Sequence, residues 1–80
     1  MEVFVGQIQL FAFNFAPRGW VLCEGQVLST MQYHTLFTLL GTNFGGDGRV
    51  TFGLPNLKGK EPVPNLHYYI ATEGLYPTRQ

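Results

Sequence analysis

Three groups of residues have side chains that could do chemistry. Cys23 and His34 could form a thiol nucleophile and its base, and Glu24 with Asp47 could form an acid–base pair. The glycine-rich run that surrounds Asp47 could cradle a phosphate. Each of these functions needs neighbouring elements that bring the groups to the right place.

The local sequence favours a structural role for each group. Cys23 lies in an apolar strand beside Leu22, where a buried and inert thiol is the commoner arrangement. Glu24 and Asp47 both lie in glycine turns, where carboxylates bond backbone amides. The glycine run follows an expected helix instead of preceding one, and it lacks the Gly-Lys-Ser/Thr signature of a phosphate loop. We therefore predict no enzymatic activity, no catalytic residues and no cofactor.

The glycine-rich stretch is predicted to shape the backbone. Glycine admits positive φ without steric cost, aspartate bonds nearby amides, and proline fixes φ while removing a donor. We expect this stretch to turn the chain from a helix back into a sheet. The predicted structural motif consists of Gly45, Gly46, Asp47, Gly48, Phe52, Leu54 and Pro55.

Four aromatic residues are candidates for an interface or a ligand contact, namely Trp20, Tyr68, Tyr69 and Tyr76. Exposed rings can stack on sugars, whereas Trp20 could equally anchor the core because it adjoins apolar residues. Tyr68 and Tyr69 are adjacent in an expected strand, so their side chains should leave opposite faces. We expect one of the two to pack inward and the other to be free for an interface.

The size of the chain predicts association with other copies. Eighty residues form one domain, and a core of that size rarely supplies more than about 3–5 kcal/mol of net stability. A single cysteine excludes an internal disulfide, and one thiol with two histidines is a poor zinc set. Seven Phe, four Tyr and one Trp exceed what so small an interior can hide, so several rings should lie at a surface that another chain covers.

Charge and hydropathy exclude several partners. The net charge is zero without any basic run, which argues against nucleic acid and anionic membranes. No apolar run approaches the roughly 20 residues of a membrane helix, and the first residues lack the basic region of a signal peptide. We expect synthesis in the cytoplasm and no membrane insertion.

The candidate residues must be positioned by short strands. Residues 3–13 read as a strand whose inward face switches at a bulge at Gly6. Residues 20–23 and 26–28 read as a hairpin joined by the tight turn Glu24-Gly25. Residues 50–52 and 66–71 read as two further strands, and the proline-rich segment 58–65 between them reads as an exposed loop.

One helix is predicted, from about Thr30 to Leu40. Ser29 and Gln32 form a capping box at its start, and Gly41 fits a left-handed cap at its end. Its apolar residues recur at helical spacing. The fold class is therefore α+β: a small single domain, spanning residues 1–80, with short, mostly antiparallel strands and one helix.

Three blocks of the sequence resemble the phage tail collar domain family over nearly the whole chain. The first compares with the family pattern G-E-I-R-x-F…P-x-G-W-x-x-C-D-G-Q, and the second with L-F-x-L-L-G-x-x-Y-G-G-D-G-x-x-T-F-x-L-P-x-L-R-G-R. The third resembles the closing pattern I-A-L-x-G-x-x-P-x-R. The matching residues of the first block are Gly6, Ile8, Phe11, Pro17, Gly19, Trp20, Cys23, Gly25 and Gln26. Those of the second are Leu36, Phe37, Leu39, Leu40, Gly41, Gly45 to Gly48, Thr51, Phe52, Leu54, Pro55, Leu57 and Gly59. Those of the third are Ile70, Ala71, Gly74, Pro77 and Arg79.

The chain departs from the family pattern in one segment above all. The insertion that longer members carry before the last strand, often with a His-rich segment associated with metal or trimerisation, has shrunk to about residues 61–66. His67 stands alone, so the resemblance carries over no metal site. Elsewhere Glu24 and Asn56 replace Asp, and Lys58 and Lys60 replace Arg, which weakens any bidentate pairing.

The resemblance implies a non-enzymatic structural protein of a phage tail or tail-like fibre assembly. It implies self-association into a homo-oligomer, in the family usually a trimer, and a place in a virion, tail-like particle or extracellular fibre. Open strand edges would also permit a filament, so the sequence is compatible with both a closed oligomer and an open filament. The alternative function is a carbohydrate- or receptor-binding module at a cell surface. The expected partners are other copies of the chain, other tail or fibre proteins, and surface glycans.

Overall fold

The computed structural model describes residues 3–78, which form five short strands and one short helix. The predicted α+β class is confirmed. The elements in chain order are β1 (Ile8–Phe11), β2 (Trp20–Leu22), β3 (Val27–Ser29), α1 (His34–Leu40), β4 (Thr51–Gly53) and β5 (His67–Ala71). Among these residues no helix has the length and apolar character needed to cross a membrane.

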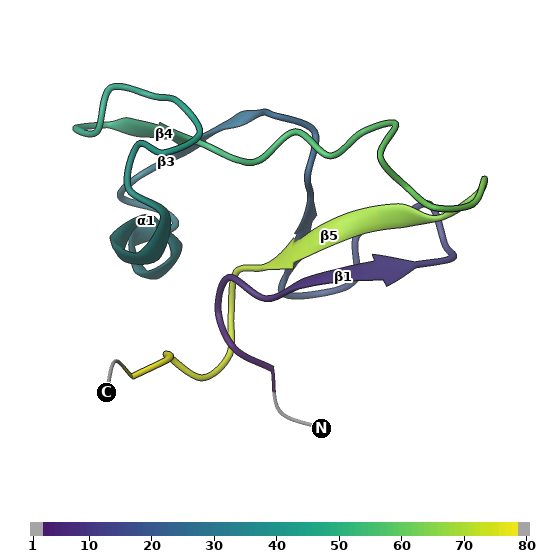
Figure 1. The fold of residues 1–80 in the computed structure, drawn as a ribbon. Coiled ribbons are helices and arrows are strands. Elements are labelled where there is room, and N and C mark those ends of the chain that lie inside the picture. Colours follow the sequence, from purple (N-terminus) through teal and green to yellow (C-terminus); the bar gives the residue numbers. More distant parts are fainter. Residues whose placement is uncertain (1–2, 79–80) are drawn as a thin grey trace.

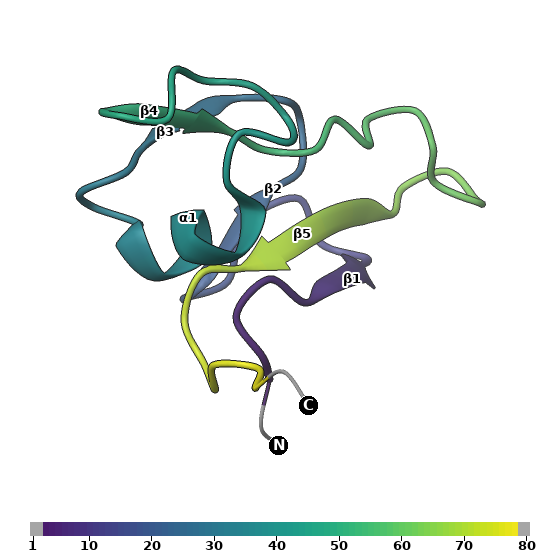
Figure 2. The ribbon, with the colours of Figure 1, turned by 60° about the vertical axis from the view of Figure 1, so that its left-hand side comes forward.

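The strands form two small antiparallel sheets (Figure 1). In the larger sheet the order is β1-β5-β2, with Ile8 opposite Ile70 and Val21 also opposite Ile70. In the smaller sheet β3 pairs with β4, with Leu28 opposite Phe52. Helix α1 lies beside the two sheets, as the turned view shows (Figure 2). Strand β5 thus lies between β1 and β2, so the larger sheet is complete only when the C-terminal part of the chain has folded in between these two strands.

The core lies where the inner faces of the two sheets meet α1. Directly opposed residues of an antiparallel pair point to the same side, and Val21, opposite Ile70, packs against the core with it. The apolar face of α1 closes the cluster with Leu36, which is fully buried. The buried members are Val5, Cys23, Leu36, Phe52, Leu54 and Ile70. Burying side chains of this size contributes about 1.5–3 kcal/mol each, before the entropy of ordering them.

Helix α1 ends as predicted but begins four residues later. Gly41 ends it with a positive φ of 58° and donates its N–H to Phe37 O at 2.8 Å. At the start, Thr30 is drawn toward the smaller sheet, because its N–H donates to Val50 O and its hydroxyl to Arg49 O. Residues 30–33 therefore form a turn, and the predicted start at Thr30 is wrong.

The predicted hairpin between residues 20 and 28 is also wrong. Strand β2 pairs with β5, and β3 pairs with β4, so the two segments belong to different sheets. The side chain of Gln26 replaces the missing strand pairing: its amide nitrogen donates to Leu22 O at 2.7 Å, and its oxygen accepts from Glu24 N–H. The backbone oxygen of Gln26 then accepts from Leu54 N–H, which directs the chain into the smaller sheet.

The first strand is shorter than expected. Gly6, with φ of 89°, belongs to a turn closed by the Gln7 N–H on Phe4 O at 3.0 Å, so the predicted bulge is a turn. Strand β1 begins only at Ile8. Before this turn, Phe4 pairs in an isolated parallel bridge with Leu75, which ties the first described residues to the last ones.

Candidate functional site

The glycine-rich turn covers one edge of the smaller sheet. Gly53 N–H donates to Gly45 O at 2.9 Å, and Gly48 N–H donates to Thr51 O at 2.9 Å. Both bonds lie on the side of β4 that faces away from β3, since Leu54 N–H and Val50 O bond toward β3. The turn thus occupies an edge where another strand could otherwise add.

This close approach requires glycine at Gly46. Its φ is +87°, and a Cβ at this position would lie 2.7 Å from both Phe52 N and Thr51 O. Contacts under 3.0 Å force the backbone to move. The Pro55 side chain is buried just beyond, and Phe52 and Leu54 belong to the core.

Asp47 organises the turn from within. Its Oδ1 accepts from the N–H groups of Arg49, Val50 and Thr51 at 2.8–3.1 Å. The N–H groups of Arg49, Thr51 and Val50 lower the pKa of this carboxyl to about 2. The Asp47 carboxylate therefore already accepts the backbone N–H groups that a bound phosphate would need. The turn does not form a phosphate site.

Among residues 3–78, strand β1 is the one strand whose outward backbone groups all lack a hydrogen bond, of the four strands that form the outer edges of the two sheets. Pairing with β5 directs the backbone N–H and C=O groups of Ile8 and Leu10 away from the sheet. Within residues 3–78 none of these four groups has a hydrogen bond. Each other outer edge has at least one group occupied.

The other edges are occupied by local bonds. On β2, Trp20 N–H donates to Pro17 O and Leu22 O accepts from Gln26. On β3, Ser29 O accepts from Tyr33 N–H. The glycine turn occupies β4 as described above.

The outward face of the larger sheet carries a cluster of stacked rings. Phe11 lies edge-on to Trp20 with ring centroids 5.1 Å apart, and it stacks on Phe13 at 5.0 Å. Tyr69 lies beneath this cluster, fully buried, and its hydroxyl donates to Phe13 O at 2.9 Å. Burial, with the nearby Glu24 carboxylate, raises the pKa of Tyr69.

These positions correct the expectation for the two adjacent tyrosines. They do lie on opposite faces, since Tyr68 is opposite Leu10 and Tyr69 is opposite Gln9. Tyr68 packs against the core cluster and is only partly exposed. Both faces of the sheet are covered at these positions. The prediction of Tyr69 as a surface contact is therefore wrong, and neither tyrosine ring is fully exposed.

Tyr76 and Trp20 keep surface access. Tyr76 is 49% exposed, and its hydroxyl lies 2.9 Å from the Thr38 hydroxyl of α1. Trp20 is partly exposed and borders the same cavity as Gln32 and Tyr33, the last residues of the turn that precedes α1. Of the four aromatic candidates, Tyr76 is the most exposed, Trp20 and Tyr68 are partly exposed, and Tyr69 is buried.

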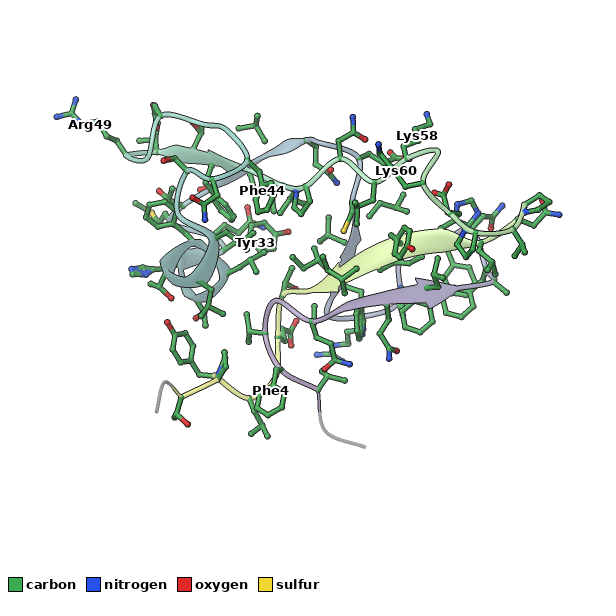
Figure 3. All side chains as sticks on the ribbon, in the orientation of Figure 1. Phe4, Tyr33, Phe44, Arg49, Lys58 and Lys60 are labelled. Atoms are coloured by element: carbon green, nitrogen blue, oxygen red, sulfur yellow. The ribbon has the colours of Figure 1, made fainter. Side chains whose placement is uncertain are left out.

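An apolar patch that the sequence did not single out lies where the two ends of the described chain meet. Phe4 and Leu75, joined by their bridge, are 50% and 45% exposed, and Tyr76 adjoins them. Figure 3 shows Phe4 at this end of the molecule. We call these three residues the end patch. No local pattern marks it, because Phe4 lies about seventy residues before Leu75 and Tyr76 in the chain.

The structure separates the residues that could have acted in catalysis. Cys23 is buried, and burial raises the pKa of its thiol to about 11, which disfavours the reactive thiolate. His34 is exposed at the start of α1, beside a different cavity from the one that Cys23 borders. Within residues 3–78 no group of three His, Cys, Asp or Glu side chains could hold a metal ion.

These features define a small scaffold domain in which the singled-out residues shape turns and edges. The family model named Phage Tail Collar Domain matches residues 6–62, and the chain therefore belongs to the phage tail collar domain family. The family is generally structural and non-catalytic, and membership indicates a structural role in a phage tail or fibre. Searches of curated proteins and of solved structures found no match.

The matched region contains the first two blocks of the resemblance and most of the fold. The third block follows it, and the structure places Ile70 and Ala71 of that block in the central strand β5. Arg79 of the third block lies outside the described residues.

Proposed function

We propose that this domain is a structural component of a phage tail, or of a tail-like or fibre assembly, and that it acts by associating with other copies of itself. The observation that carries the proposal is the open edge of β1. The backbone groups of Ile8 and Leu10 point away from the sheet, whereas the other outer edges are partly occupied. An edge of this kind is a template for pairing with another strand.

The sequence of β1 supports this assignment. Proteins protect exposed edges with charged side chains, proline or bulges, and the strand Ile-Gln-Leu-Phe has none of these. Ile8 is 40% exposed, so pairing would also bury apolar surface. A second copy can present the same strand in antiparallel orientation, without any repulsion between charges on the strand.

The end patch offers a second surface for growth beyond one pair. Half-exposed Phe4 and Leu75 are apolar side chains of the kind that other chains cover. If only the β1 edges pair about a two-fold axis, the product is a closed dimer. Use of a second surface would extend the assembly to a larger closed oligomer or to a filament. Other tail or fibre proteins are alternative partners for the same patch.

The test of the β1 edge compares two substitutions at Ile8. In Ile8→Pro the outward N–H is removed, and proline is tolerated as the first residue of an edge strand. In Ile8→Thr the N–H remains while apolar surface is lost. We expect the unmodified protein to sediment above its monomer mass of 9.0 kDa, Ile8→Thr to associate nearly as well, and Ile8→Pro to be monomeric.

Circular dichroism of each variant serves as the folding control. Equal association by folded Ile8→Pro and Ile8→Thr would place the contact elsewhere. Substituting Leu75→Ser in the same experiment reports on the end patch: a smaller assembly would show its use, and an unchanged mass would limit the contact to β1.

A further inference from the structure

A cavity of about 380 Å³ opens between the start of β2, the turn before α1 and the residues that follow β5. Its volume lies within the range of about 300–1,000 Å³ that is typical of small-ligand sites. The walls come from three separate segments, two of which are bonded to each other, since Thr72 N–H donates to Gly19 O at 2.7 Å. The cavity is therefore part of the packed scaffold, unlike the second cavity, which is bordered by the loop from Lys58 to Leu66.

Two aromatic residues border this cavity, Trp20 and Tyr33. The ring of Trp20 meets that of Phe11 edge-on. Tyr33 packs against the core beside α1 (Figure 3). Both rings are partly exposed. Rigid, half-exposed rings present the flat apolar surfaces on which the C–H faces of sugar rings pack.

Polar groups surround the rings. The side chains of Gln32, His34 and Glu73 border the cavity and are exposed, and within residues 3–78 none of the three has a hydrogen bond. The carbonyl oxygen of Trp20 also points to the outer edge of β2, because Gly19 and Val21 make the bonds to β5. The cavity thus combines acceptors and donors that can reach several hydroxyl groups at once.

The charges at this cavity restrict the ligand. Among residues 3–78 its lining contains one carboxylate, that of Glu73, and no lysine or arginine. A sugar that bears phosphate, sulfate or a carboxylate would therefore meet a like charge without a lysine or arginine to pair with among these residues. Neutral hydroxyl groups can instead donate to the Glu73 carboxylate, an interaction of the stronger, charge-assisted kind.

We propose that the cavity between Trp20 and Tyr33 binds a neutral hexopyranose unit of a glycan, with the sugar ring packed on Trp20 and its hydroxyl groups bonded to Glu73 and Gln32. This site assigns a binding activity to the domain beyond its structural role. It does not depend on self-association, because the cavity is formed within one copy.

Trp20 is the only tryptophan in the chain, so its fluorescence reports on this cavity directly. The probes are the methyl glycosides of glucose, galactose, mannose and N-acetylglucosamine, titrated up to roughly 50 mM, with methyl glucuronide as the anionic comparison. We expect at least one neutral glycoside to change the emission saturably, with a dissociation constant on the order of 1 mM. Methyl glucuronide should bind at least about tenfold more weakly.

Variants on the exposed rim separate binding from folding. Glu73→Gln removes the charge that strengthens hydrogen bonds to the sugar hydroxyl groups, and Gln32→Ala removes the amide that bonds to them. Each variant should weaken binding about tenfold, which corresponds to about 1.4 kcal/mol. Glu61→Gln borders the other cavity and is the matched control, which should bind as the unmodified protein does. Saturation-transfer NMR on the same samples detects binding that leaves the emission unchanged.

Three results would overturn the proposal. They are the absence of binding for all four neutral glycosides by both methods, equal binding of methyl glucuronide, and unchanged affinity in both rim variants. Sedimentation of the same samples tests self-association separately. If the protein associates but binds no sugar, only the proposal of sugar binding in the cavity is refuted.

Discussion

Replacing Gly46 by alanine should destabilise the domain far more than the same replacement at Gly59. The two glycines have nearly the same backbone conformation, with φ of +87° and +85°. They differ in the room for a side chain: a Cβ at Gly46 would lie 2.7 Å from Phe52 N, whereas a Cβ at Gly59 would have no neighbouring atom within 4 Å. The pair therefore separates steric overlap from conformational strain.

The expected losses follow from these contacts. Placing alanine at a positive φ costs about 1–2 kcal/mol at either position. At Gly46 the overlap also moves the turn off β4, which breaks the bonds from Gly53 to Gly45 and from Gly48 to Thr51, worth about 0.5–1.5 kcal/mol each. The total at Gly46 is then about 2–5 kcal/mol, close to the roughly 3–5 kcal/mol that a small core supplies.

Urea unfolding monitored by far-ultraviolet circular dichroism measures both losses in free energy of unfolding. We expect Gly59→Ala to remain folded with a modest loss and Gly46→Ala to be mostly unfolded or to unfold at much lower urea. Gly46→Val should be worse still, because branching adds to the overlap. Equal losses for the two alanine variants would refute the role of the turn as a close-fitting cover of the β4 edge.

Two pH-dependent effects should accompany this one. The folded-state pKa of Asp47 is lowered from 3.8 to about 2, so the ionised carboxylate stabilises the fold fully above about pH 4, and this stabilisation is lost as the pH falls toward 2. Asp47→Asn should therefore remove this loss of stability when the free energy of unfolding is measured at decreasing pH. If the variant loses stability over the same pH range, the role of Asp47 is contradicted. Because burial raises the pKa of Cys23 to about 11, its contribution holds below about pH 9 and is lost as the pH rises toward 11, and the thiol should react with a thiol reagent at pH 8 much faster in urea than in the native protein. Equal reaction rates in both conditions would show that Cys23 is accessible.

Local patterns predicted the features that depend on local interactions. The apolar spacing that includes Leu36 and Phe37, together with Gly41, located the body and end of α1, because helix packing and its C-terminal cap involve residues a few positions apart. Alternation in the last strand correctly placed Tyr68 and Tyr69 on opposite faces.

The failures have non-local causes. The start of α1 was misplaced because Thr30 bonds to Arg49 and Val50, nineteen and twenty residues away. The hairpin was misassigned because strand partners come from β4 and β5, while the side chain of Gln26 satisfies the turn. A two-residue turn signal between apolar runs does not reveal that a side chain makes these hydrogen bonds in place of a partner strand.

The candidate surface was predictable only in part. Composition alone indicated that apolar rings would remain exposed, and half-exposed Phe4 and Tyr76 agree with this. Which strand edge stays open depends on the order β1-β5-β2, and which tyrosine is covered depends on the loop that carries Phe13. Both follow from contacts between distant segments, which no pattern along the chain encodes.

Hydrogen exchange at the amides of β1, followed as the protein is concentrated from low to high micromolar, tests the proposed assembly most directly. The N–H groups of Ile8 and Leu10 point outward, whereas that of Gln9 points toward β5. We predict that Ile8 and Leu10 become protected from exchange as the sedimenting mass rises above 9.0 kDa, while Gln9 is protected throughout. A protein that stays at the monomer mass, or one that associates while Ile8 and Leu10 exchange at unchanged rates, would contradict assembly through the β1 edge.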